Sequence, residues 1–148
     1  MNSGTEIRSV VYGSPSVAAS TFQRTHLERL AFADVLARLR KSIEAADMWI
    51  LHEIDPQALL AKDGYRIGPA RQILFFHPRL MARLLGTDPA AVLEAPLKFV
   101  VLELADGTVM VSWNDPTGAL ARYQNAALTA LGEELSRACQ AIAEDFHG

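Results

Sequence analysis

The stretch Lys98–Asn114 reads KFVVLELADGTVMVSWN, and the expected fold class follows from it. Two runs of β-branched and apolar residues, Lys98–Leu104 and Thr108–Asn114, are separated by Ala-Asp-Gly. Asp-Gly favours a tight hairpin turn, because such a turn needs positive φ angles that glycine adopts without steric cost. The sequence therefore predicts an antiparallel β-hairpin.

Side-chain alternation indicates how the two strands of this hairpin lie. In the second strand Val109, Val111 and Trp113 point to one face, while the residues between them point to the other. In the first strand both alternating sets are apolar, which is typical of a strand inside the sheet.

Prolines mark the expected starts of the short helices. Proline suits the first helical position because its missing N–H would be unpaired there, and a preceding aspartate can cap the free amides. This pattern occurs at Asp55-Pro56, Asp88-Pro89 and Asp115-Pro116, with His77-Pro78 as a fourth junction. It predicts short helices over Pro56–Lys62, Pro78–Leu85 and Pro89–Glu94.

Longer patterns complete the expected order of elements. Apolar residues at helical spacing predict a helix over Ala33–Ala46 and one long helix after Pro116, running to Phe146 with a bend near Gly132. The remaining predicted strands are Thr25–Ala31, Met48–Ile54 and Ile73–Phe76. A hairpin combined with grouped helices predicts an α+β fold, in which an antiparallel sheet carries helices on one face.

The chain of 148 residues suits a single domain. Residues 1–22 are rich in Ser, Gly and Ala, and we interpret them as an N-terminal extension that is loosely attached or adds an edge strand through Val10-Val11-Tyr12. Residues 23–148 are expected to form the α+β domain.

Composition favours a cytoplasmic protein with no nucleic-acid or membrane partner. The net charge of −3 gives no general attraction to nucleic acid or anionic lipid, and no apolar run approaches the ~20 residues of a membrane span. The N-terminus lacks the apolar core of a secretion signal. Cys139 is the single cysteine, so no intrachain disulfide can form, and its helical spacing from Leu135 and Ile142 predicts an inert buried thiol.

The segment Ile73–Pro116 resembles domain-of-unknown-function family 302. The resemblance is carried by His77-Pro78, Pro96-Leu97-Lys98, Asp106-Gly107 and Asn114-Asp115-Pro116, in that order, and the pattern of Leu27–Ile54 fits the first half of the family. It implies a two-layer α+β fold similar to the TATA-binding-protein-like arrangement, with a curved antiparallel sheet, and a homodimer. It implies no established activity.

Two positions depart from that family's pattern. Many relatives have Gly-Asn-Pro where this chain has Phe76-His77-Pro78, and several have Asp-His where it has Asp55-Pro56. If those polar residues serve a shared function, this chain has lost or altered it.

His77 admits two interpretations. At a helix N-terminus the backbone dipole disfavours a charged imidazolium, and a neutral ring keeps one acceptor nitrogen that can cap a free amide. The alternative is a working group, either a proton acceptor or a ligand contact in a cleft.

The surroundings of His77 are basic. No acidic residue lies between positions 63 and 88, and four arginines do: Arg66, Arg71, Arg79 and Arg83. A helix N-terminus with arginines nearby is a sensible anion site. We therefore hypothesise that His77 and these arginines bind a carboxylate- or phosphate-bearing molecule, the alternative being that the arginines pair with Asp63, Asp88 or Glu94 on a solvated face.

Motifs for metal, cofactor or catalysis are missing from the sequence. The histidines, His26, His52, His77 and His147, are not spaced four apart, and no paired thiols occur, so neither a metal nor a cofactor is predicted. There is no nucleophile elbow, phosphate-binding loop or dinucleotide motif. Whether the protein is an enzyme stays open.

Three functions follow as hypotheses. The first is a non-catalytic, homodimeric binding or regulatory module for a small anionic ligand. The second is a small enzyme that uses His77 as an acid or base on an acidic substrate. The third is a protein-interaction module that docks a flat apolar face along Leu131, Leu135 and Ile142.

Overall fold

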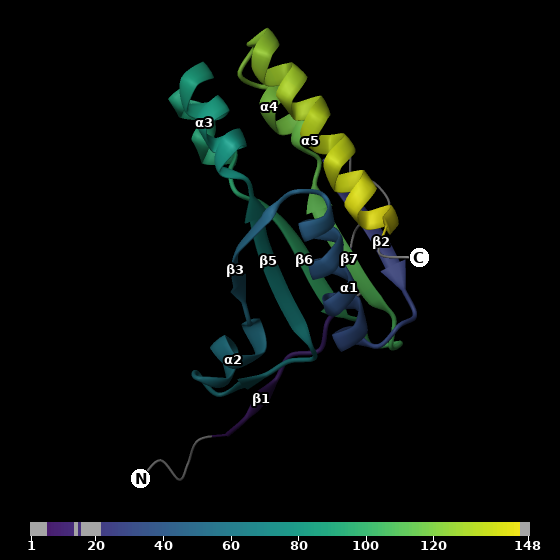
Figure 1. Cartoon of the computed structure of the whole chain (residues 1–148). Coiled ribbons are helices and arrows are strands. Elements are labelled where there is room, and N and C mark those ends of the chain that lie inside the picture. Colours follow the sequence, from purple (N-terminus) through teal and green to yellow (C-terminus); the bar gives the residue numbers. More distant parts are fainter. Residues whose placement is uncertain (1–5, 14, 16–21, 146–148) are drawn as a thin grey trace.

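The computed structural model describes residues 6–13, 15 and 22–145. Its main sheet has five strands in the order β2-β7-β6-β5-β3, and every neighbouring pair is antiparallel (Figure 1). The strands are β2 Gln23–Glu28, β3 Trp49–Ile54, β5 Ala70–Phe76, β6 Leu97–Glu103 and β7 Val109–Asn114. The predicted antiparallel sheet is confirmed.

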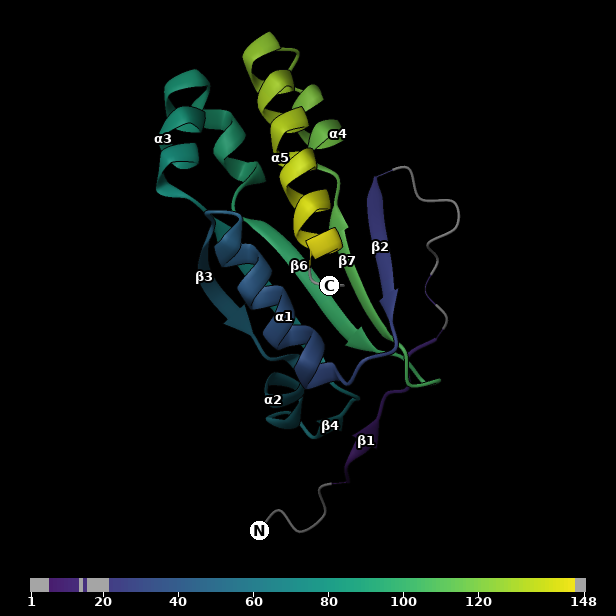
Figure 2. The ribbon, with the colours of Figure 1, turned by 45° about the vertical axis from the view of Figure 1, so that its right-hand side comes forward.

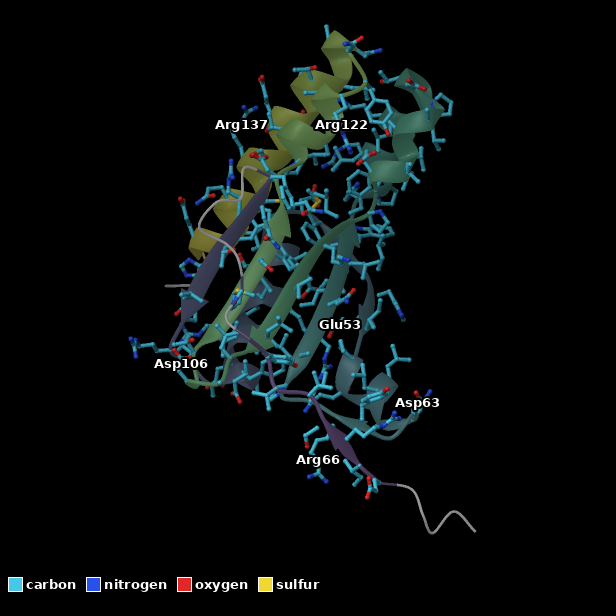
Figure 3. The ribbon with its side chains drawn as sticks, turned by 180° about the vertical axis from the view of Figure 1, so that it is seen from behind. Glu53, Asp63, Arg66, Asp106, Arg122 and Arg137 are labelled. Carbon is cyan, nitrogen blue, oxygen red and sulfur yellow. The ribbon has the colours of Figure 1, made fainter. Side chains whose placement is uncertain are left out.

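Helices cover one face of this sheet. The helical elements are α1 Phe32–Ala45, α2 Pro56–Ala61, α3 Pro78–Thr87, the 3₁₀ helix η1 Pro89–Glu94, α4 Pro116–Ala121 and α5 Ala126–Asp145. Figure 2 shows α1 and α5 in front of the strands, and Figure 3 shows the opposite face of the sheet from behind. We call that opposite side the open face. The predicted α+β architecture, with helices on one face and a long C-terminal helix, is confirmed.

The predicted hairpin is present. Strands β6 and β7 pair from Glu103↔Val109 to Val100↔Ser112. Gly107 in the turn has a φ of 87°, the left-handed conformation for which glycine was expected. Strand β6 lies between β5 and β7, as its two apolar faces predicted.

The core lies between the sheet and the two covering helices. Val109 and Val111 of β7 are fully buried, as are Val35, Leu39 and Ile43 of α1. Aromatic rings link the central strands: Phe75 stacks on Phe99 at 4.8 Å between ring centroids, and Phe99 meets Trp113 edge to face at 5.4 Å. The alternation on β7 therefore points Trp113 toward the helices, and Ser112 and Asn114 toward the open face.

The proline-initiated helices are capped as predicted. The carboxylates of Asp55, Asp88 and Asp115 accept hydrogen bonds from the backbone N–H groups of Ala58, Ala90 and Thr117, respectively. Each cap satisfies an amide that the first helical turn leaves unpaired.

The prediction of one continuous helix after Pro116 is wrong. Helix α4 ends at Ala121, Gln124 has a φ of 53°, and the Asn125 side chain starts α5 by accepting from the N–H groups of Ala127 and Leu128. The break therefore lies at residues 122–125 rather than at Gly132, because a new cap begins there. The expected helix end at Phe146 falls outside the described residues.

Part of the N-terminal extension lies beside α2. Strand β1, Arg8–Ser9, pairs in parallel with β4, Tyr65–Arg66, apart from the main sheet. The Val10 N–H donates to the Arg66 carbonyl at 2.9 Å, and the Tyr12 hydroxyl donates to the Gly68 carbonyl at 2.9 Å. Residues 1–5, 14 and 16–21 of the predicted extension lie outside the described part of the chain.

Within the described part of the chain, no helix combines the length and the apolarity needed to cross a membrane.

Candidate functional site

His77 caps helix α3. Its Nδ1 accepts a hydrogen bond from the Arg79 backbone N–H at 3.0 Å, and its ring meets the Trp49 ring edge to face at 5.5 Å. Because Nδ1 is an acceptor in this bond, a neutral ring carries its hydrogen on Nε2. Nδ1 is then occupied by the Arg79 amide and Nε2 carries the hydrogen, so the neutral ring has no free acceptor nitrogen. This geometry fits the cap interpretation better than the role of a proton acceptor.

Asp47 occupies the place where an external anion was expected. Its carboxylate lies 3.2 Å from the Arg79 guanidinium and 4.0 Å from Nε2 of His77. Asp47 follows α1 in a left-handed conformation with a φ of 61°, and sits 30 residues before His77 in the chain. The pair with Arg79 is exposed, so it contributes at most about 1 kcal/mol.

The other predicted ligand-binding arginines do not join His77. Arg83 pairs with Glu134 of α5 at 2.7 Å, and Arg71 lies 3.9 Å from Glu53 and 3.6 Å from Asp55. Arg66 is exposed beside β1, at the opposite end of the molecule from α3 (Figure 3). Of the five predicted residues, only His77 and Arg79 share one location.

A bidentate ion pair joins α1 to the edge strand β3. The Arg40 guanidinium donates to both oxygens of Glu53, at 2.7 and 2.8 Å. This hydrogen bonding, followed by the charges of Arg40 and Arg71, lowers the pKa of Glu53 even though burial opposes the shift. This ion pair fixes α1 to β3 and lies on the helix-covered side of the sheet.

A cavity lies elsewhere, where β6 and β7 separate. Leu97, Lys98 and Phe99 pair with β5, while Trp113 and Asn114 pair with β2. Pairing between β6 and β7 themselves begins only at Val100↔Ser112. Figure 2 shows the two strands close together at their hairpin end and spread at the end that carries α3, α4 and α5. We call this opening the fork.

A cavity of about 420 Å³ fills the fork and extends to η1, α4 and α5. This size falls within the roughly 300–1,000 Å³ of small-molecule sites. Its apolar lining includes Phe76, Leu84, Trp113, Leu120, Leu135 and Cys139. Its polar lining comprises Gln23, Glu94, Lys98, Ser112 and Asn114. We call this space the fork cavity.

One charged residue of the fork cavity is already neutralised. Glu94 accepts a hydrogen bond from the Tyr123 hydroxyl at 2.6 Å and lies 3.3 Å from the Arg122 guanidinium. The hydrogen bond to Glu94 raises the pKa of the Tyr123 phenol, with burial adding to the effect. These contacts tie η1 to the residues that follow α4, and so connect two walls of the cavity.

Two polar groups of the cavity have no such partner. Lys98 is exposed and makes no ion pair or side-chain hydrogen bond with the described residues, so no carboxylate among them opposes its charge. Ser112 as a whole is only 4% exposed, and its hydroxyl makes no hydrogen bond to the same residues; since no buried side-chain oxygen or nitrogen among them lacks a partner, this hydroxyl oxygen remains accessible from the cavity.

Cys139 contributes an uncharged thiol to the lining of the cavity. It is 1% exposed, and burial, with a smaller contribution from the charge of Asp115, raises the pKa of its thiol to about 12. The burial predicted for this cysteine is confirmed. A thiol with so high a pKa is protonated at neutral pH, and its inertness stays a prediction. Among the described residues, no group of three or more His, Cys, Asp or Glu side chains is arranged to hold a metal ion.

Sequence reasoning did not find the fork cavity. The available signal was Lys98, the lone cation of a mostly apolar strand, together with Ser112 in the facing strand. Neither is informative by itself, because the cavity exists only where the register lets two strands part.

Comparison with known proteins agrees with the fold. The model of the family described as "Domain of unknown function DUF302" matches residues 22–146. The crystal structure of an uncharacterized conserved DUF302 protein from Bacillus stearothermophilus is 19% identical, with a TM-score of 0.78, and the match covers 85% of this chain and 98% of that one. At this identity the likeness shows the fold alone. A search of curated proteins finds no match.

Proposed function

The chain belongs to the DUF302 family, and on this premise we propose that it is a cytoplasmic, homodimeric and non-catalytic protein that binds a small anionic molecule in the fork cavity. One observation carries the proposal: the cavity is lined by a cation, Lys98, and an accessible hydroxyl, Ser112, and neither has a partner among the described residues. A bound anion would satisfy both groups.

The surrounding charges support an anion rather than a cation. Glu94, the one carboxylate among the described lining residues, is engaged by Tyr123 and Arg122. The Lys98 ammonium is left as the uncompensated charge of the cavity, and an opposite charge stabilises it most.

A binding role agrees with the state of the two groups most suited to catalysis. The Cys139 thiol is protonated, and the Nδ1 acceptor of His77 is occupied by the Arg79 amide. His77 also caps α3 rather than lining the fork cavity. The enzyme hypothesis based on His77 therefore has no supporting contact.

The interaction-module hypothesis loses its expected surface. Leu131, Leu135 and Ile142 are each no more than 2% exposed, because α5 packs this side against the core of its own domain. The proposed homodimer has a different source of support: β3 is an edge strand, and Trp49 and Leu51 on it are 56% and 49% exposed. Exposed sheet edges with apolar residues are prone to pair with another chain. Sedimentation of the purified protein will show its mass, and a monomer at all concentrations contradicts this part of the proposal.

A thermal-shift screen of small anions tests the binding function. A molecule that binds only the folded state raises the melting temperature, by an amount that grows with its concentration over Kd. The screen is run on the unmodified protein, on Lys98→Gln, and on the matched control Arg79→Gln, which removes an exposed cation outside the cavity.

The expected result is a shift that persists in Arg79→Gln and is lost in Lys98→Gln. A shift that is lost in Arg79→Gln and kept in Lys98→Gln moves the anion site to the start of α3, as the sequence first indicated, and overturns the cavity as the site. A screen in which no anion stabilises the unmodified protein overturns the binding function.

A further inference from the structure

The fork cavity crosses the plane of the sheet. On β7, Trp113 points toward the helices, while its neighbours Ser112 and Asn114 point to the open face, and all three line the same cavity. Paired strands would block such a passage. The cavity continues from one face to the other because β6 and β7 are unpaired beyond Val100↔Ser112.

The two sides of the cavity differ in polarity. On the helix side Leu120, Leu135 and Cys139 are each 2% exposed or less. These groups carry no charge at neutral pH, because the Cys139 thiol remains protonated. This side favours an apolar body, which gains free energy by leaving water.

The open-face side offers one charge and one hydroxyl. Lys98 and Ser112 line it without partners among the described residues. Together they match the requirements of a single carboxylate, which accepts hydrogen bonds and carries one negative charge. A second negative charge would find no further cation among the described residues of the lining.

From this polarity we infer that the ligand is an amphipathic monocarboxylate that passes through the fork. Its apolar body lies against Trp113 and Leu135, and its carboxylate lies at Lys98 and Ser112 on the open face. The inference rests on the proposed binding function and specifies the class of molecule that the cavity takes.

Trp113 provides the readout. It lines the cavity, whereas Trp49, the other tryptophan, is 56% exposed and lies beside His77. In a Trp49→Phe protein the fluorescence therefore reports on the cavity alone. This protein is titrated with butanoate, hexanoate, octanoate and decanoate, and with 1-octanol and octylamine as matched probes of the charge.

Affinity is expected to rise about fourfold per added methylene until the cavity is full, and then to level off. Octanoate should bind at least about tenfold more tightly than octylamine, since an opposite charge near Lys98 is favourable and a like charge is not. In the Trp49→Phe background, Lys98→Gln should remove the advantage of octanoate over 1-octanol and leave the affinity for 1-octanol unchanged. The control Arg79→Gln should leave the affinities for octanoate and for 1-octanol unchanged.

A cavity-filling variant tests the position of the ligand's alkyl chain. Ala119 lines the cavity and is partly exposed, so Ala119→Leu adds volume at the wall without disturbing a buried side chain. In this variant the alkanoate length beyond which affinity no longer rises should be shorter by one or two carbons. An unchanged limiting length contradicts the placement of the alkyl chain in the fork.

The outcomes separate this inference from the proposed function. If alkanoates bind no better than butanoate while a polar anion such as phosphate or citrate quenches Trp113 through Lys98, the inference is wrong and the proposed function stands. If octylamine binds as well as octanoate, the inference is also wrong. If no anion of either kind changes the fluorescence of Trp113, both are overturned.

Discussion

Gly132 of α5 lies against the backbone of Pro116 in α4: a Cβ atom at position 132 would be 3.0 Å from the Pro116 carbonyl oxygen. The same atom would lie 3.2 Å from the Thr117 Cα and 3.2 Å from the Leu120 Cβ. This contact lets α4 pack closely on α5, and it positions Pro116 and Leu120 in the wall of the fork cavity.

Gly132→Ala is expected to lower the free energy of unfolding by up to about 2 kcal/mol. Alanine is favoured over glycine inside a helix by ~1 kcal/mol, but the overpacking against Pro116 costs about 1–3 kcal/mol and exceeds that gain. Gly118→Ala in α4 is the matched control, because a Cβ there meets nothing within 4 Å. Urea unfolding should show opposite signs for the two variants, and a stabilised Gly132→Ala protein contradicts the close packing.

His77→Ala is expected to destabilise the protein by about 1 kcal/mol, because the Arg79 N–H loses its acceptor at the start of α3. His77→Asn should retain most of the stability, since a short amide side chain is also a good N-cap. Chemical denaturation of the three proteins measures both effects. Equal stability of the alanine and asparagine variants would show that the cap contributes little.

Glu53→Gln is expected to change how stability depends on pH. The pKa of Glu53 is lowered below its ordinary value of 4.5, chiefly by the hydrogen bonds from Arg40. The folded state therefore favours the charged form, and this contribution is fully present above pH ~4.5 and declines as the pH falls through the folded-state pKa. Urea unfolding between pH 7 and pH 3 should show that the unmodified protein loses its advantage over Glu53→Gln in acid. Arg40→Met removes the same ion pair by changing its other member. An advantage of the unmodified protein that is undiminished at pH 3 contradicts this account.

The Cys139 thiol is expected to react with an aromatic disulfide reagent at pH 8 on the order of a thousandfold more slowly in the folded protein than in urea. Burial raises its pKa to about 12, and only the thiolate attacks, so the reactive fraction is very small. The absorbance of the released thiol measures the rate. Comparable rates in the folded and unfolded states would mean that the thiolate forms readily in the fork cavity.

Several features followed from short stretches of sequence, because their causes act over a few residues. The turn at Asp106-Gly107 and the aspartate caps at positions 55, 88 and 115 involve atoms no more than three residues apart. The alternation of β7 likewise depends on the backbone of one strand. The ordered set of these local motifs was also sufficient to indicate the DUF302 family, which the match over residues 22–146 confirms.

The site could not be found by the same reasoning. The arginines between positions 63 and 88 looked unpaired along the chain, but folding brings Asp47 to Arg79 and Glu134 to Arg83. The break between α4 and α5 was also missed, since Asn125 initiates a new helix inside an apolar pattern that continues past it.

By itself, then, the sequence determined the hairpin, the helix starts and the α+β class, because backbone preferences and side-chain period are properties of neighbouring residues. Only the tertiary structure decided that Lys98 and Ser112 meet in one cavity. Beyond Val100↔Ser112, β6 remains paired only with β5, and β7 remains paired only with β2. The cavity therefore depends on pairing between strands that are distant in the chain.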